Sequence, residues 1–250
     1  MIKLFVLDID GCIAHPFQSP DWEAITEIRA LNHQSQHDPS IPSLTLCTGR
    51  PFPYAEAVAQ WLGIEHPFVF ESSLLYFPKD HRVQTGHEGV PEPLQKFRTW
   101  LTDELLPEHP GAMLEFAKMM DAGVVSNDKE LINRIYKRVL QVTRDHYPEL
   151  EVHRTDASVN TLPAGNNKVA GMERIARELE IPHEEIAYIG DSGGDLEALK
   201  RVARPFAPLN AIDEVKKVAQ TLPEEATRAV LLAYRQLIEE NRSEPTNGEA

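Results

Sequence analysis

The stretch "KLFVLDIDGC", residues 3–12, decides the fold of this chain and raises a question of charge. Residues 4–7 form an uninterrupted apolar run, which is typical of a strand buried on both faces of a parallel sheet. The run leads into two carboxylates, Asp8 and Asp10, and then Gly11. Two like charges about 6 Å apart repel by roughly 3 kcal/mol at an effective dielectric constant of about 20. A chain that ends a buried strand in this way needs something to offset the repulsion.

The composition predicts a folded chain with a sizeable core and an acidic surface. The 250 residues are 42% hydrophobic, which suits one large domain or a domain with an insert. No apolar run approaches the roughly 20 residues that span a bilayer, and Asp8 comes too soon for a secretory signal, so we expect a cytoplasmic protein. The net charge of −14 argues against nucleic acid and against an anionic membrane as partners.

Short apolar runs that alternate with helical patterns predict an α/β core with a parallel sheet. After the first run, strands are predicted within "SLTLCTGR" (residues 43–50), "HPFVFES" (66–72) and "EEIAYIGD" (184–191). A helix is predicted over residues 53–62, with Gly63 as its stop. This core domain is assigned residues 1–77 and 164–240.

The alternation of strands and helices stops in the middle of the chain, and the pattern there predicts an inserted α+β domain over residues 78–163. Helical patterns cover residues 92–107 and 128–147, and the second carries an apolar stripe with helical spacing. Strand-like pieces occupy residues 112–120, 123–126, 150–154 and 158–162. The polar end of the chain, residues 241–250, is predicted to be a disordered tail.

Four polar clusters fall at or near the carboxyl ends of the predicted strands, where ligands bind in open parallel sheets. They are Asp8 with Asp10; Thr48 with Gly49 and Arg50; Lys168; and Asp191 with Asp195. Each cluster alone is an ordinary turn, helix cap or solvated charge, so the argument depends on their joint placement. Carboxylates gathered at one edge require a cation, and an oxygen-only ligand set favours Mg²⁺.

The remaining groups suit a phosphate. Thr48 and Gly49 stand between a strand and a helix, where a hydroxyl and backbone N–H groups can hold phosphate oxygens. Lys168 lies at the start of a helical pattern, an unfavourable place for a cation unless an anion binds nearby. One carboxylate can then attack phosphorus to form an aspartyl-phosphate, while a second protonates the leaving group and activates water. A metal ion and Lys168 would offset the charge on the transferring phosphoryl group.

These residues resemble the four motifs of the haloacid dehalogenase (HAD) superfamily of phosphatases. The first motif matches "DIDGC" at Asp8, the second "LCTGR" at Thr48, the third Lys168 and the fourth "IGDSGGD" at Asp191. The chain is most similar to Cof-like members with a C2-type cap. The resemblance implies a Rossmann-like parallel-sheet core (the HAD fold) with an α+β cap inserted between the second and third motifs.

The resemblance also implies a role for each matching residue. Asp8 would be the nucleophile and a metal ligand, and Asp10 the acid/base with its backbone carbonyl on the metal. Asp191 would be the third protein ligand of Mg²⁺. The expected substrate-binding residues are Thr48, Gly49, Arg50, Lys168 and Asp195, of which Asp195 would support metal-bound waters or pair with Lys168.

The sequence departs from the family pattern in places that bear on substrate and efficiency. Ser72 and Ser73 stand where relatives often have Asn-Gly, and Gly194 stands where relatives usually have Asn. Polar candidates for contacting the leaving group lie in the insert, although a solvated strand residue is the favoured interpretation of each: Glu115, Lys118, His153, Arg154 and Asn160. Cys12 and Cys47 are expected to be buried thiols, with a redox switch as the alternative.

The leading hypothesis is therefore a Mg²⁺-dependent phosphatase that hydrolyses a phosphate monoester of a small metabolite, either a sugar phosphate or a phosphorylated acid. A phosphomutase or phosphotransferase acting on sugar phosphates is the alternative enzyme, since a sugar hydroxyl can replace water in the second step. A non-catalytic binding or regulatory protein on the same fold is the alternative from another class. Release of inorganic phosphate distinguishes the first hypothesis from the other two.

Overall fold

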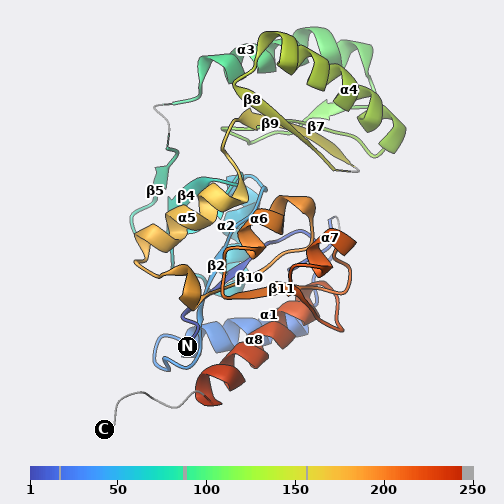
Figure 1. Cartoon of the computed structure of the whole chain (residues 1–250). Coiled ribbons are helices and arrows are strands. Elements are labelled where there is room, and N and C mark those ends of the chain that lie inside the picture. The colour runs from blue at the N-terminus through green and yellow to red at the C-terminus, as the bar shows by residue number, and fades with distance from the viewer. Residues whose placement is uncertain (17, 87–88, 156, 244–250) are drawn as a thin grey trace. The chain divides into compact units, whose positions relative to one another are not determined.

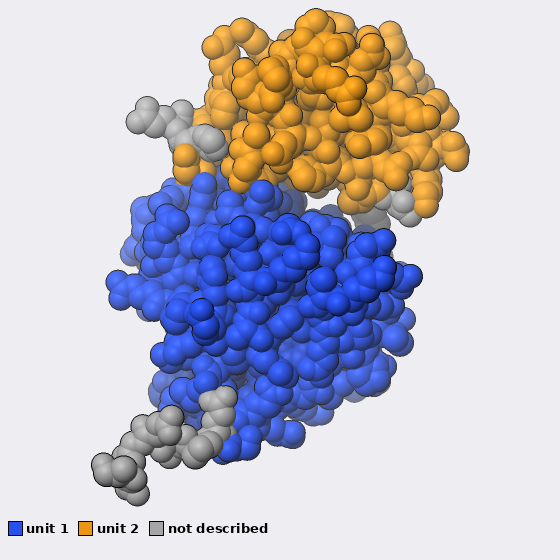
Figure 2. Space-filling model, in the orientation of Figure 1, with its two compact units in different colours: residues 1–84, 167–250 blue, residues 85–166 orange. Residues whose placement is uncertain are grey.

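The computed structural model describes residues 1–16, 18–86, 89–155 and 157–243, and it contains two compact units. Unit 1 comprises residues 1–84 and 167–250, and unit 2 comprises residues 85–166 (Figure 2). The insert expected over residues 78–163 corresponds to unit 2 with shifted bounds. The shift at the first boundary arises because β5 (Arg82–Gln84) pairs with a strand of unit 1.

Unit 1 is built on a five-stranded parallel sheet with the strand order β12-β11-β10-β1-β2 (Figure 1). Its strands are β1 (Leu4–Leu7), β2 (Ser43–Leu46), β10 (Ile186–Ile189), β11 (Arg204–Ala207) and β12 (Gln220–Thr221). In the register of the sheet, Leu7 lies opposite both Leu46 and Ile189. The residues that follow β1, β2 and β10 therefore emerge together at one edge, as expected for strands that run in parallel.

Helices cover both faces of this sheet, which confirms the predicted α/β class. They are α1 (Trp22–Gln34), α2 (Phe52–Leu62), α5 (Lys168–Glu178), α6 (Leu196–Leu199), α7 (Asp213–Lys216) and α8 (Ala226–Ser243). Because strand side chains alternate, Leu4 and Val6 join a core cluster with Met172 of α5. Phe5 points to the other face, where its ring lies 5.9 Å from that of Tyr234 in α8.

The predicted stop of α2 is confirmed at Gly63. This residue has a φ of 65°, and its N–H donates to the carbonyls at the end of the helix. Only glycine adopts this left-handed conformation without strain, so the helix ends where the sequence indicates.

The third predicted strand forms, but it belongs to a different sheet. β3 (Phe68–Phe70) pairs antiparallel with β4 (Leu74–Phe77), which pairs with β5. A single bridge between Cys47 and Val69 links β3 to the end of β2. The cause is a tight turn after β3, in which the backbone has positive φ values at Glu71 and Ser72 and reverses direction.

Unit 2 has a four-stranded antiparallel sheet with the order β6-β7-β9-β8. Its elements are α3 (Glu92–Trp100), β6 (Met113–Leu114), β7 (Ala122–Val125), α4 (Lys129–His146), β8 (Leu150–Arg154) and β9 (Ser158–Pro163). The chain continues from α3 through a π-helical turn (Leu101–Leu105) and a 3-10 turn (Leu106–Glu108). The apolar stripe predicted on α4 packs on the sheet, with Ile132, Ile135 and Val139 in the core of the unit.

The prediction of a disordered tail from residue 241 is wrong for its first three residues. α8 runs to Ser243, and the Asn241 side chain bonds the backbone N–H and C=O of Ile2, both at 2.8 Å. The sequence did not reveal this contact, because an asparagine that bonds the backbone of a distant segment cannot be distinguished by composition from a solvated one. Residues 244–250 lie outside the described residues. None of the helices described in the structure is both long enough and apolar enough to cross a bilayer.

Candidate active site

The ends of β1 and β10 bring Asp8 and Asp191 together. One carboxylate oxygen of each residue and the Sγ of Cys12 all lie within 4.8 Å of one another. Mg²⁺ binds oxygen ligands at about 2.0–2.1 Å, so two oxygens at this spacing can share one ion after a small adjustment. The two carboxylates thus fit the divalent cation that the sequence predicts.

The electrostatics of the pair explain why a cation is favoured there. Burial raises the pKa of Asp8 well above its usual value; Lys168 opposes the increase, and the neighbouring carboxylates add to it. Burial, and then the charge of Asp195, raises the pKa of Asp191 to about 7. Both carboxylates are therefore costly to ionise in this environment without a bound cation.

Gly11 allows the carboxylate of Asp191 to approach the turn after β1. Its φ is 69°, and a Cβ at this position would lie 2.0 Å from an oxygen of Asp191. Any side chain would therefore displace Asp191. The carbonyl of Gly11 accepts a hydrogen bond from the Asn210 side chain at 2.9 Å, which holds the turn in place. Nothing in the sequence marks Asn210, which lies in the loop after β11.

Lys168 lies at the centre of a buried ionic network. It is the first residue of α5, and its ammonium group lies 2.7 Å from Asp8 and 2.6 Å from Asp195. Burial alone would lower the pKa of Lys168, but the charges of Asp195 and Asp8 outweigh burial and raise that pKa well above its usual value. The side chain is thus held as a cation directly beside the carboxylate of Asp8.

Asp195 is fully buried, and donors satisfy both of its oxygens. One oxygen accepts from Lys168 and from the Tyr188 hydroxyl at 2.8 Å, and the other accepts from the backbone N–H and the hydroxyl of Ser192. Sequence reasoning missed both Tyr188 and Ser192. A signal for Tyr188 existed, because a tyrosine in the middle of the buried run "IAYI" must find a partner for its hydroxyl.

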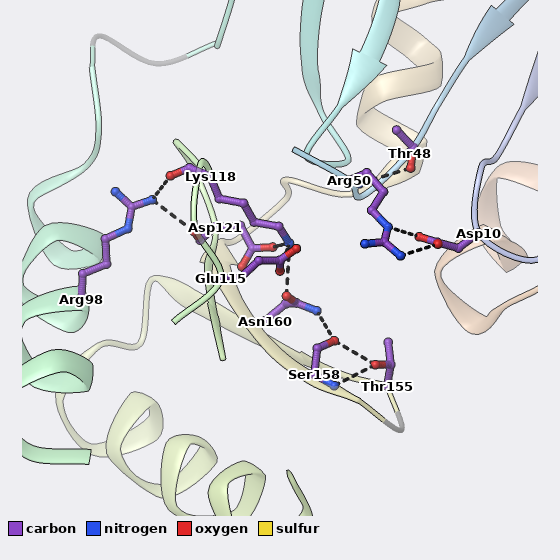
Figure 3. Close-up of polar contacts among 10 residues, drawn as sticks. All are labelled: Asp10, Thr48, Arg50, Arg98, Glu115, Lys118, Asp121, Thr155, Ser158 and Asn160. Atoms are coloured by element: carbon purple, nitrogen blue, oxygen red, sulfur yellow. Dashed lines mark hydrogen bonds and ion pairs between the residues drawn. The ribbon is translucent and has the colours of Figure 1, made fainter. Parts of the chain in front are cut away.

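Thr48, Gly49 and Arg50 follow β2 and precede α2, as predicted. The buried Thr48 hydroxyl accepts a hydrogen bond from the Arg50 N–H at 3.2 Å. The Arg50 guanidinium binds the Asp10 carboxylate with two parallel hydrogen bonds of 2.7 and 2.6 Å (Figure 3). Such bidentate pairs have strong, directional geometry. The structure therefore pairs one expected substrate-binding residue, Arg50, with the expected acid/base, Asp10.

Ser72, which departs from the family pattern, lies in a tight turn of the backbone. Ser72 has a φ of 66°, a conformation that asparagine and glycine adopt most readily. Its N–H donates to the carbonyl of Thr48 at 2.8 Å, and its own carbonyl leaves no room for a Cβ on Gly171 of α5. The turn therefore ties together the loop after β2, β3 and the helix that carries Lys168.

The polar candidates of unit 2 divide into a buried group and an exposed group. The Lys118 ammonium lies 2.9 Å from Glu115, 2.6 Å from Asp121 and 3.2 Å from the Asn160 side chain (Figure 3). This lysine is nearly inaccessible and fully partnered, not solvated. His153 and Arg154, by contrast, are exposed on β8.

The family model that describes haloacid dehalogenase-like hydrolases matches residues 108–230, a range that includes Lys168, Asp191 and Asp195. Among characterised relatives, the chain is 29% identical to phosphoglycolate phosphatase 1 of Saccharolobus solfataricus, over 88% of each chain. It is 26% identical to the phosphoglycolate phosphatase of Methanopyrus kandleri, over 96% of this chain and 99% of the relative.

Solved structures share the fold at lower identity. A protein of Thermoplasma acidophilum superposes with a TM-score of 0.75 at 18% identity, covering 95% of this chain and 98% of the other. A haloacid dehalogenase-like hydrolase of Bacteroides thetaiotaomicron gives a TM-score of 0.75 at 14% identity, covering 95% and 100%. Fold and site together describe an α/β protein with a buried ionic centre at the carboxyl edge of its parallel sheet. The chain is similar to haloacid dehalogenase-like hydrolases over residues 108–230 and to phosphoglycolate phosphatases over most of its length. With these similarities, it is a phosphatase, a phosphoric monoester hydrolase.

Proposed function

We propose that the protein is a Mg²⁺-dependent phosphatase that forms an aspartyl-phosphate on Asp8 and acts on a small phosphorylated acid. The proposal depends on the position of Asp8, whose carboxylate lies 2.7 Å from the Lys168 ammonium group and within 4.8 Å of a carboxylate oxygen of Asp191. Asp8, Asp191 and the backbone carbonyl of Asp10 would hold the ion. Mg²⁺, when bound, would offset the negative charge of the carboxylates and of the transferring phosphoryl group.

Each residue of the site then has its own role in the proposed reaction. A carboxylate oxygen of Asp8 attacks phosphorus and the ester oxygen leaves, so the phosphoryl group is carried on Asp8 until water attacks it. Lys168 orients Asp8 and places a positive charge beside the equatorial oxygens of the phosphoryl group. Asp195 holds Lys168 in place, with Tyr188 and Ser192 fixing Asp195 in turn. The Thr48 hydroxyl and the Gly49 amide are proposed to hold the remaining phosphate oxygens.

The pair between Arg50 and Asp10 must separate during turnover. Each oxygen of Asp10 accepts one hydrogen bond from the guanidinium, so the leaving-group oxygen must compete with Arg50 for Asp10. An incoming phosphate or carboxylate offers Arg50 the same bidentate partner. We therefore propose that substrate binding transfers Arg50 from Asp10 to the substrate and frees Asp10 to act as acid and base.

This exchange predicts a specific kinetic effect for Arg50→Gln. A hydrogen bond to a charged group contributes about 1.5–3 kcal/mol, so kcat/KM should fall roughly 10- to 100-fold, mostly through an increase in KM. Steady-state kinetics with the best substrate measure the split. Arg235→Gln is the matched control, because Arg235 pairs with Glu27 on the exposed side of α8. A normal KM in the Arg50 variant would remove Arg50 from substrate binding.

The substrate class follows from the relatives and from the local charges. Relatives named phosphoglycolate phosphatases match over most of their length, and their substrate is a small acid that carries a phosphate ester. An acidic protein needs local cations to hold such a dianion, and Lys168, Arg50 and the metal ion would supply them. We therefore propose phosphoglycolate or a phosphorylated acid of similar size as the substrate, ahead of sugar phosphates.

The test is a metal-dependent assay of phosphate release over a substrate panel. With EDTA we expect no turnover, and addition of Mg²⁺ should restore it. Without the ion, the negative charge of the Asp8 and Asp191 carboxylates would repel the phosphate group of the substrate. The panel would contain phosphoglycolate, other phosphorylated acids, sugar phosphates and an aryl phosphate. Interconversion of sugar phosphates without release of phosphate would favour a mutase. Absence of turnover on every member with Mg²⁺ would favour a binding protein.

A further inference from the structure

The cation site contains a third donor that an oxygen-only Mg²⁺ site does not use. The Sγ of Cys12 lies within 4.8 Å of the same oxygens of Asp8 and Asp191 that would bind the ion. Cys12 is completely buried in the turn after β1. Its backbone N–H donates to Ile9, but among the described residues its thiol has no hydrogen-bond partner.

The second cysteine provides a contrast. Cys47 is equally buried, yet its thiol lies 3.6 Å from the carbonyl of Lys168 and can donate to it. Cys47 thus has a local structural partner, whereas the Cys12 thiol faces two carboxylates and nothing that it pairs with. The two thiols are equally buried, but only the Cys47 thiol has a hydrogen-bond acceptor among the described residues.

Two carboxylate oxygens and one sulfur form a donor set that suits soft and borderline cations better than Mg²⁺. Thiolates select zinc and related metals, and the affinity of a site for divalent first-row ions rises from manganese to copper and then falls at zinc. Zinc bonds of about 2.3 Å to sulfur and about 2.0–2.2 Å to oxygen require ligand atoms within about 4.5 Å of one another. The three donor atoms already lie within 4.8 Å of one another, so only a small adjustment is needed.

We propose that the site between Asp8 and Asp191 also binds thiophilic divalent cations such as Zn²⁺, Cd²⁺ and Co²⁺, with Cys12 as a third ligand. Binding breaks the S–H bond, releases the proton to water and forms a sulfur–metal bond with the sulfur electron pair, without oxidation or reduction. Because these cations would occupy the same carboxylates as Mg²⁺, they inhibit turnover by displacing Mg²⁺. The inhibitory part rests on the proposed function, whereas the metal site does not.

The direct test is the absorption spectrum of the full chain with added Co²⁺ or Cd²⁺ and no substrate. A thiolate bound to either ion gives a ligand-to-metal charge-transfer band in the ultraviolet, and carboxylates alone give none. We expect the band in the wild-type protein and its loss on addition of EDTA or excess Mg²⁺. The chain has two cysteines, so a band retained in Cys47→Ser can come only from Cys12.

The matched variant is Cys12→Ser, which keeps the size of the side chain but replaces sulfur with oxygen. We expect it to lose the band and to bind Cd²⁺ at least about tenfold more weakly, since even outer-shell changes weaken metal binding by about 10- to 100-fold. Absence of a band in both wild type and Cys47→Ser overturns the proposal, as does a band that persists in Cys12→Ser. A band in a protein without phosphatase activity would support the metal site and remove only the proposed inhibition.

Discussion

Asp8→Asn is expected to lower kcat by at least about 10⁴-fold, because an amide oxygen cannot attack phosphorus to form the acyl phosphate. The same substitution should leave the fold intact. Burial raises the pKa of Asp8 well above its usual value, so in the metal-free protein the ionised side chain is a cost that asparagine removes. Lys168 keeps Asp195 as its partner in the variant.

Two measurements test this prediction. Phosphate release should be lost in Asp8→Asn and normal in Asp213→Asn, an exposed carboxylate at the start of α7 that serves as the control. Wild-type protein quenched in acid during turnover should carry a phosphoryl group on the peptide that contains Asp8. Retained turnover in the Asn variant, or a melting temperature well below that of the wild type in EDTA, would contradict the assigned role.

The sequence could predict that the carboxylates of the candidate site meet, because this prediction needs only the ends of parallel strands. An apolar run of four residues buried on both faces fixes the next residue at the carboxyl edge of the sheet, whichever helices cover it. Asp8 and Asp191 meet for this reason, since β1 and β10 are neighbours in register. The pattern also placed Lys168 at the start of a helix, although burial beside Asp8 and Asp195 could be seen only in three dimensions.

What the sequence could not supply was the pairing of side chains across the site. Arg50 was expected to bind substrate, yet its long side chain reaches Asp10, and no local spacing rule connects residues 40 positions apart. Tyr188 and Asn210 act through single hydrogen bonds to Asp195 and Gly11, which a strand or loop pattern does not reveal. β3 belongs to a separate sheet because the chain turns at Ser72 with a positive φ. Serine rarely adopts this conformation, so the sequence did not predict the turn.

The position of the Cys12 thiol beside the proposed metal site could not be predicted from the sequence either. In the sequence, Cys12 is only the small residue that follows Asp-Gly in the first motif, and a free cysteine is usually a small buried apolar residue. Its proximity to Asp8 and Asp191 depends on the backbone at Gly11, whose positive φ turns the chain back towards the end of β10. The ligand set of the site is therefore a property of this turn as much as of the carboxylates.

Lys168→Met is expected to abolish turnover and to destabilise the metal-free protein by about 3–5 kcal/mol. Removing one partner from a buried ion pair leaves the other charge uncompensated, and here both Asp8 and Asp195 lose the ammonium group. Methionine retains most of the side-chain volume, so the loss reports charge rather than a cavity. Lys200→Met is the control, because Lys200 forms an exposed pair with Glu197 that contributes at most about 1 kcal/mol.

The pH dependence of this loss distinguishes charge from packing. Lys168 lowers the pKa of Asp8, so its removal should raise that pKa further above the unfolded value of about 3.9. A carboxyl group with a raised native pKa binds more protons in the folded state, so its contribution is complete at low pH and is lost as the pH rises through the native pKa. Urea unfolding in EDTA should therefore show a smaller difference between Lys168→Met and wild type at pH 5 than at pH 8. An equal difference at both values would mean that the lysine stabilises the fold through packing alone.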